Sequence, residues 1–202
     1  MPLIWLLITL CIVYISSDNV YGENYKNIDT TYMTKAKNIK SEKYIDTIKI
    51  KKDSLTNMLI TEIDNYIRKQ SPNANEKLSN IIAENCLNNN IDICFLMAQT
   101  QNETNFGTSG IGKENSKKSI FGIRSRKYDN YEKAIKDYCF IIKTKYLGEN
   151  RSEKDLMNNF TSLSGLRYAE ASSYEYYLKI TYKAIKRKTK INEIQMEIRS
   201  MS

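Results

Sequence analysis

LMAQTQNETNFGTSG, residues 96–110, is the stretch that decides the fold. It lies inside an apolar pattern that starts after Asp92, a residue type favoured at helix N-caps, and runs with helical spacing to Glu103. Shortly after Glu103 the sequence becomes rich in glycine: four of the chain's seven glycines fall between residues 107 and 122. We therefore predict a helix that ends near Glu103 and opens into a shaped, glycine-rich loop.

Helical spacing of apolar residues extends on both sides of that stretch. The further predicted helices cover residues 54–70, 75–88, 131–146, 152–160 and 173–187. Proline occurs only at positions 2 and 72, so no predicted helix is interrupted. The fold class that follows is mainly α, with little sheet.

The two ends of the chain differ from its middle. Residues 3–15, LIWLLITLCIVYI, form an uncharged apolar run that is short for a membrane span but suits the core of a secretory signal. We predict a signal peptide over 1–22 that exports the protein to the periplasm, cell envelope or exterior, with an uncleaved membrane anchor as the alternative. Residues 23–52 are polar and have no helical stripe, which predicts a linker containing at most one short strand over 44–51. A single domain would then cover 53–190, followed by a tail over 191–202.

Composition excludes several classes of enzyme. The chain has 31 Lys+Arg against 23 Asp+Glu, for a net charge of +8, and none of its 202 residues is histidine. Without imidazole, Ser-His and Cys-His nucleophile pairs and the HExxH zinc site cannot form, which excludes zinc peptidases, zinc amidases and papain-like hydrolases. We expect no metal and no cofactor, so acid–base chemistry falls to carboxylates, Tyr, Lys or Cys.

The cysteines beyond the signal are odd in number. Cys86, Cys94 and Cys139 have spacings that fit no metal motif and no disulfide scaffold. We interpret them as small buried core residues. A disulfide between Cys94 and Cys139 is the alternative.

Glu103 is the strongest candidate for chemistry. On a helix it shares a face with Leu96 and Thr100, and it lies where the glycine-rich loop opens. A carboxyl held there is partly desolvated, which raises its pKa and lets it donate a proton near neutrality. Phe106 would add an apolar wall. An ordinary exposed glutamate at a helix end is the alternative.

Three segments carry a family resemblance. They are residues 96–110, then IFGI at 120–123, then YEKAIKDY at 131–138. In this order they resemble the bacterial and phage glucosaminidase domain of glycoside hydrolase family 73, which includes the hydrolase domain of the flagellar rod protein and many autolysins. The resemblance spans roughly residues 75–186 and departs from the family pattern at Lys118-Ser119, where Asn-Asn-Leu is usual.

The resemblance implies a lysozyme-like single domain. Its implied activity is that of an endo-β-N-acetylglucosaminidase, which cleaves the β-1,4 bond after N-acetylglucosamine in peptidoglycan glycan strands, with Glu103 as general acid. Many relatives carry a second carboxylate on a β-hairpin, but here only residues 124–130 are available, so the β-lobe is expected to be minimal or truncated. The nearest carboxylates in sequence are Glu114, Asp129 and Glu132. The substrate's own acetamido group is the alternative for that second role.

The resemblance also implies the other site residues. Gly165 to Ala169, followed by Tyr174, resembles the family's Gly-Tyr-Ala and downstream Tyr, which makes Tyr168 the implied phenol that orients the sugar or the attacking water. Tyr168 packing as an amphipathic wall is the alternative. The implied substrate-binding residues are Gln99, Phe106, Gly107, Thr108, Ser109 and Tyr174.

Two other functions stay open at this point. A lytic transglycosylase also has a Glu-Ser/Thr-x-aromatic motif after a helix, but usually continues with Gly-Leu-Met-Gln where this chain has Phe-Gly-Ile. A non-catalytic wall-binding or virion protein of the same fold would explain the missing hairpin.

The basic run near the end of the last predicted helix bears on partners. Its members are Lys183, Lys186, Arg187, Lys188 and Lys190. With an export signal and only Tyr182 as a neighbouring aromatic, attraction to an anionic wall polymer or membrane surface is favoured over nucleic acid, and we expect no nucleic-acid partner. The sequence does not indicate an oligomeric state.

Overall fold

A computed structural model describes the backbone of residues 30–113, 118–122 and 126–201. The signal or anchor expected over 1–22 lies outside these residues. None of the helices in the described part is long and apolar enough to cross a membrane. The chain divides into two compact units at Thr47/Ile48, and the residues discussed below lie in the unit Ile48–Ser202 unless stated otherwise.

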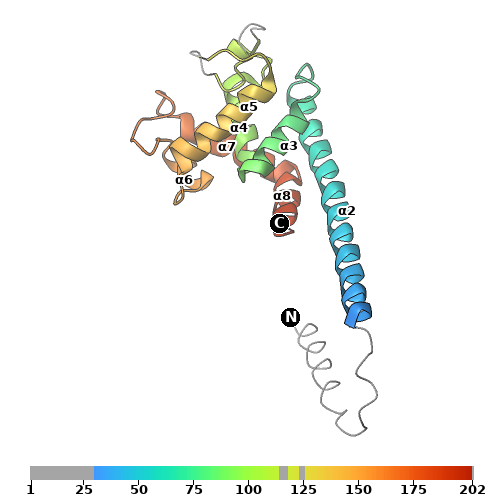
Figure 1. Cartoon of the computed structure of the whole chain (residues 1–202). Coiled ribbons are helices and arrows are strands. Elements are labelled where there is room, and N and C mark those ends of the chain that lie inside the picture. The colour runs from blue at the N-terminus through green and yellow to red at the C-terminus, as the bar shows by residue number, and fades with distance from the viewer. Residues whose placement is uncertain (1–29, 114–117, 123–125, 202) are drawn as a thin grey trace, which may run out of the picture. The chain divides into compact units, whose positions relative to one another are not determined.

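The described residues form helices joined by loops (Figure 1). The α-helices are α2 Thr30–Gln70, α3 Leu78–Asn89, α4 Ile93–Thr104, α5 Tyr131–Ile141, α6 Glu153–Asn158, α7 Tyr174–Lys188 and α8 Ile191–Ser200. A 3-10 turn, η1, covers Gly110–Lys113, and a π-helical turn, η2, continues α5 over Ile142–Leu147. One isolated antiparallel bridge joins Thr161 to Arg167, and the described residues contain no sheet. The prediction of a mainly α fold is confirmed.

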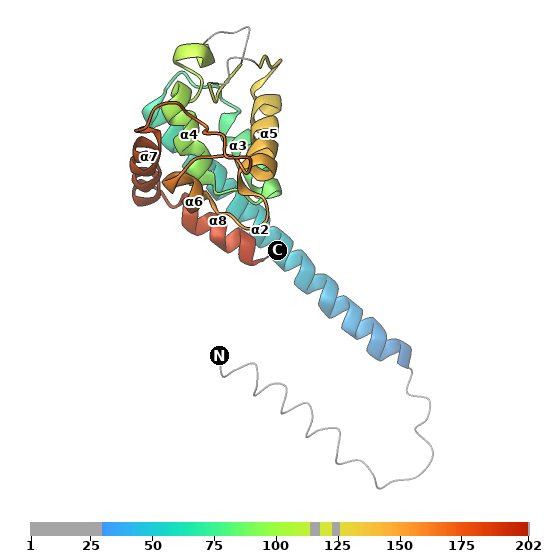
Figure 2. The ribbon, with the colours of Figure 1, turned by 90° about the vertical axis from the view of Figure 1, so that its left-hand side faces the viewer.

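α4 is the central helix of the unit. It lies between α7 on one side and α3 and α5 on the other (Figure 2). Its residues 93–100 are all fully buried, which is the pattern of a helix enclosed by protein rather than of one with a solvent face. Only its last turn, which carries Glu103, reaches the surface.

Side-chain caps set the helix boundaries near the predicted positions. The Asp92 carboxylate accepts a hydrogen bond from the Phe95 amide at 3.2 Å, so the predicted N-cap of α4 is confirmed. Asn130 does the same for α5, accepting from the Lys133 amide at 2.8 Å. α2 ends at Gln70, directly before the Ser71-Pro72 pair.

The strand considered over 44–51 is wrong, because these residues are part of α2. The described side chains from Tyr44 to Ser54 are exposed or half-exposed, and burial begins at Leu55. An unpacked helix needs no apolar stripe, so its sequence shows no helical period. The stretch expected as a linker is therefore helical over 30–52.

The prediction of a tail over 191–202 is also wrong for residues 191–200, which are helical. They form α8, which buries Ile191, Ile194 and Ile198 against the core. Buried Gln195 accepts a hydrogen bond from the Ile93 amide at 3.0 Å and donates one to the Ile91 carbonyl at 2.7 Å. α8 therefore belongs to the domain and fastens the beginning of α4.

The cysteines are core residues, as predicted. Cys86, Cys94 and Cys139 are buried and free, so the bridge considered between Cys94 and Cys139 is not formed. Burial raises the pKa of the Cys86 thiol well above its usual range, with the neighbouring Cys139 thiol adding to the effect.

Candidate active site

Glu103 lies at the edge of a cavity of about 700 Å³. Its side chain is half-buried in the last turn of α4, where the helix emerges from the core. The described residues that line the cavity are Glu103, Phe121, Gly122, Arg126, Tyr138, Ile141, Lys145, Tyr146, Tyr168, Ala169 and Glu170. The acid expected from sequence therefore borders a cavity large enough for sugar rings.

Burial raises the pKa of the Glu103 carboxyl above its ordinary value of 4.5. The nearby Tyr174 and Tyr168 phenols lower this pKa and only partly offset the effect of burial. The environment thus favours the protonated carboxyl while presenting it to the cavity.

Gly122 leaves room for that carboxyl. Its φ is +68°, and a Cβ at this position would lie 2.6 Å from Glu103 Oε2. Any other residue there would be strained and would displace the acid. The glycine of the Phe-Gly pair is thus a direct neighbour of Glu103, whereas Ile123, which follows it, lies outside the described residues.

Aromatic rings form the wall beside Glu103. Tyr168 stacks on Phe160 with ring centroids 4.3 Å apart, and Phe121 stacks on buried Tyr138 at 3.6 Å. Tyr174 lies 5.3 Å from Tyr168, between centroids. Burial raises the pKa of both the Tyr168 and Tyr174 phenols, and the nearby Glu103 charge adds to this, so both stay protonated near neutrality.

Gln99 and Tyr174 lie behind the acid rather than on the cavity surface. Gln99 is fully buried one turn before Glu103, and its amide makes no well-aligned hydrogen bond with the described residues. The Tyr174 hydroxyl is close enough to Gln99 and Glu103 for both to affect its pKa, and it is likewise without a well-aligned bond to the described residues. These buried polar groups can reorganise around the carboxyl, but neither residue is among those that line the cavity.

The loop after Glu103 holds the helix end, and its side chains are not among the described residues that line the cavity. Asn105, Phe106 and Gly107 all have positive φ, and Phe106 is buried edge-on against Tyr66. Thr108 Oγ1 lies 2.6 Å from Ser71 Oγ, whereas Ser109 is exposed. Phe106, Gly107, Thr108 and Ser109 are not among the residues that line this cavity, and the substrate-binding roles implied for them stay predictions.

One threonine joins this loop to the Phe-Gly segment. Thr104 Oγ1 is buried, donates to the Ile120 carbonyl at 2.6 Å and accepts from the Gly107 amide at 3.0 Å. Through these two bonds the residue next to Glu103 sets the position of residues 120–122 over the acid.

The second carboxylate at the cavity is Glu170. Of the three considered from sequence, Glu114 lies outside the described residues. Asp129 is exposed and paired with Lys133, which lowers its pKa, and Glu132 is exposed on the first turn of α5; neither lines the cavity. Glu170 comes directly after Ala169. The sequence did not indicate it, because the family pattern places the second carboxylate in the hairpin region.

Two cations also line the cavity. Arg126 pairs with Asp137, which in turn accepts a hydrogen bond from Tyr128 Oη at 2.5 Å. Lys145 has no ion pair with the described residues. The site therefore combines the carboxyl groups of Glu103 and Glu170 with two cations. Arg126 is neutralised by Asp137, and Lys145 has no such partner among the described residues.

Lysines also gather around a separate cavity of about 430 Å³ between α6 and α7. Lys154, Lys179, Lys183 and Lys186 line it, together with Tyr182, whose ring lies under the Lys186 ammonium at 5.3 Å. None of the four makes an ion pair with the described residues. This cluster, which we term the lysine pocket, includes two residues of the predicted basic run.

Comparisons with known proteins add no relative. The chain matches no family model, no curated protein and no solved structure.

Proposed function

We propose that the protein is a peptidoglycan hydrolase that cleaves the β-1,4 glycosidic bond after N-acetylglucosamine. The observation that carries the proposal is the half-buried Glu103 carboxyl, with a raised pKa, at the edge of an aromatic-walled cavity of about 700 Å³. The resemblance of residues 96–110, 120–123 and 131–138 to family 73 glucosaminidases supports the choice of substrate. The lysozyme-like character of the domain is part of this proposal.

Glu103 acts as the general acid in this reaction. Breaking a glycosidic bond requires a proton on the leaving oxygen while positive charge builds on the sugar carbon. A desolvated carboxyl retains that proton at higher pH than an exposed one, and transfer to the oxygen leaves a carboxylate facing the developing cation. The phenols of Tyr168 and Tyr174 then hydrogen-bond the carboxylate as it forms.

Glu170 is the group in this chain suited to the second role. It lies in the same cavity and is exposed, so it remains a carboxylate able to activate water or stabilise the sugar cation. The alternative is the substrate's acetamido group, which would make Glu170 dispensable.

The variant Glu103→Gln tests the proposal. It keeps the shape of the side chain and removes the proton, so release of fragments from purified peptidoglycan should fall by about 10²–10⁴-fold. Glu84→Gln, at an exposed position on α3, is the matched control and should behave as wild type.

Three outcomes are informative. Equal clearing of peptidoglycan by wild type and Glu103→Gln would contradict the enzyme and favour a binding or structural protein. Anhydro-muramic ends in the products would identify a lytic transglycosylase, whereas reducing N-acetylglucosamine ends support the hydrolase.

We propose in addition that the lysine pocket binds the anionic polymer of the wall. The four ammonium groups, which have no ion pair with the described part of the chain, repel one another, and phosphate groups would relieve that repulsion. Tyr182 is the only aromatic residue among the described residues that line the pocket, whereas single-stranded nucleic acids bind to several aromatic rings on which successive bases stack, so a phosphate polymer is the favoured ligand.

The lysine pocket is tested with inorganic polyphosphate and duplex DNA as probes at two salt concentrations. The double variant Lys183→Gln/Lys186→Gln should weaken polyphosphate binding by roughly tenfold and flatten its salt dependence. Lys136→Gln/Lys143→Gln, two exposed lysines on α5 and η2, removes the same charge elsewhere. An equal loss in this control, or tighter binding of DNA than of polyphosphate, would contradict the assignment.

A further inference from the structure

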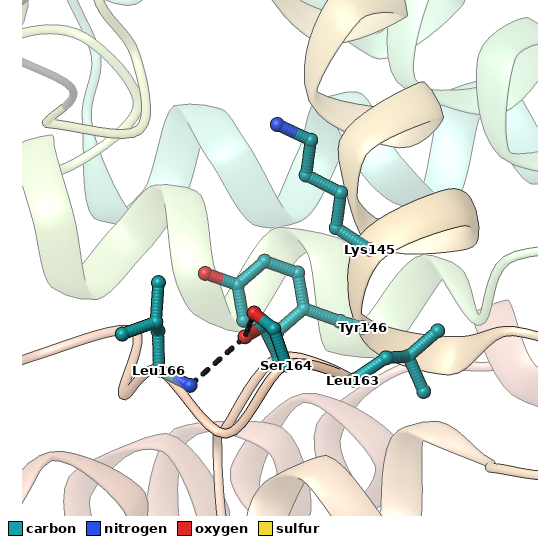
Figure 3. Close-up of a pocket in the computed structure, with 6 residues that line it drawn as sticks. Lys145, Tyr146, Leu163, Ser164 and Leu166 are labelled. Carbon is teal, nitrogen blue, oxygen red and sulfur yellow. Dashed lines mark hydrogen bonds between the residues drawn. The ribbon is translucent and has the colours of Figure 1, made fainter.

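A second cavity, of about 470 Å³, adjoins the one at Glu103. Lys145 and Tyr146, at the end of η2, line both cavities, so the two are direct neighbours. In Figure 3 these two side chains lie on one side, and Leu163, Ser164 and Leu166 of the loop 161–167 lie on the other. A ligand that fills the first cavity therefore has a neighbouring space into which a substituent can extend.

The loop 161–167 is held in a fixed shape. The Ser162 amide donates to the Leu166 carbonyl at 2.7 Å, and the Leu166 amide donates to Ser162 Oγ at 3.0 Å. The Leu163 amide donates to the Lys145 carbonyl at 2.8 Å, which fastens the loop to η2. The side chains on this loop are thus presented to the cavity before any ligand binds, which lowers the entropy lost on binding.

This cavity combines apolar and cationic surface. Leu163 and Leu166 are 56% and 71% exposed on the loop, and Leu163 lies over Gly148, where an added Cβ would be 3.1 Å from it. The Lys145 ammonium has no ion pair with the described residues. A ligand that fits has small apolar groups and a carboxylate, rather than the uncharged hydroxyls of a plain sugar.

We infer that this cavity binds the short peptide substituent of the glycan strand. In peptidoglycan every second sugar carries a lactyl-linked peptide with small apolar side chains and free carboxylates, which matches the two leucines and Lys145. The inference rests on the proposed function, because it takes the sugars to occupy the cavity at Glu103. It makes the peptide-bearing strand, and not an unsubstituted polymer of N-acetylglucosamine, the preferred substrate.

Binding of a soluble probe tests the cavity independently of cleavage. N-acetylmuramyl dipeptide and the N-acetylglucosamine dimer are titrated into Glu103→Gln protein by calorimetry. The added double change Leu163→Ser/Leu166→Ser should weaken dipeptide binding by roughly tenfold and leave the dimer's affinity unaltered, because both leucines are lost from an apolar contact. Met196→Ser, an exposed apolar position on α8, is the matched control.

Kinetics supply the second readout. Wild type should have a kcat/KM roughly tenfold higher on strands that keep their peptides than on strands from which the peptides were removed, and Leu163→Ser/Leu166→Ser should lose that ratio. Equal dipeptide affinity in the protein with and without the leucine changes, or a retained ratio, would overturn the inference. Failure of the proposed function has a different signature, namely wild type and Glu103→Gln being alike on every substrate.

Discussion

Two loops flank Glu103, and they behave in opposite ways. The loop 105–112, next to Glu103 in sequence, buries Phe106 and binds Ser71 through Thr108. The loop 161–170, far away in sequence, contributes Tyr168, Ala169 and Glu170 to the cavity. The first loop packs against the end of α4 that carries the acid, and the second lines the cavity beside it.

The two loops separate two structural roles, namely positioning the candidate acid and lining the cavity beside it. Residues next to a catalytic candidate in sequence are constrained by the need to end a buried helix and to place its last turn. Contact with a ligand falls to whichever chain segment lies across the cavity, and that segment is not visible from local sequence. If this division holds, variants in the first loop change stability, and variants in the second change activity.

Among variants that compare these two regions, the largest effect is expected for Glu170→Gln. Loss of the second carboxylate should lower kcat by about 10²-fold, with little change in melting temperature, because the side chain is exposed. The measurement is the rate of reducing-end release, with the exposed Glu149→Gln as control. Full activity in Glu170→Gln would assign the second role to the substrate's acetamido group.

Thr104→Val should act mainly on stability. The change keeps the shape of the side chain but leaves the buried Ile120 carbonyl and Gly107 amide without their partner, which costs about 2 kcal/mol of unfolding free energy. For a domain of this size that corresponds to a melting temperature lower by roughly 5 °C.

Calorimetry and activity, measured below the transition, separate the outcomes for Thr104→Val. Exposed Ser109→Ala, in the loop that follows α4, should leave the melting temperature unchanged. A fall in activity at constant melting temperature would show that the Thr104 bonds act on the position of Glu103 rather than on stability.

The smallest effect is a pH dependence of stability. Because burial raises the pKa of Glu103 above 4.5, the folded chain binds more protons than the unfolded chain between 4.5 and the raised pKa. The free energy of unfolding contributed by this group therefore falls as pH rises through that window. Below 4.5 the carboxyl is protonated in both states, and this loss is absent.

Denaturant unfolding of wild type and Glu103→Gln across pH checks this sign. The stability of Glu103→Gln relative to wild type should increase from acid pH to neutrality, because the amide has no proton to lose. A difference that stays constant with pH would mean that the carboxyl is not desolvated in solution.

Much of the fold was predictable from sequence because it depends on local pattern. Apolar residues at helical spacing located α3 to α7, and Asp92 marked the beginning of α4 through its capping carboxylate. α8 was missed although Ile191, Ile194 and Ile198 provide a helical stripe, because the basic run before it was taken as the end of the domain. Residues 44–54 of α2, whose side chains are exposed or half-exposed, have no such stripe, and this part of the helix was not recoverable from periodicity.

The site was predictable only at its centre. Glu103 was identified from its place at the end of an apolar helix and from the resemblance, and Tyr168 from the Gly-Leu-Arg-Tyr-Ala segment. Glu170, Arg126 and Lys145 were not, because they meet Glu103 only through long-range packing of three other segments. Spacing along the chain carries no information about such encounters.

The beginning of α4, at the opposite end of that helix from Glu103, depends on α8. Gln195 fastens residues 91–93, at the opposite end of α4 from Glu103, about 15 Å away along the helix axis. The basic stretch that precedes α8 is rich in sites for trypsin-like proteases. A cut there would leave α8 attached to the domain only through the packing of its three isoleucines and the two Gln195 bonds, and loss of α8 would then uncover the apolar start of α4 without touching the cavity.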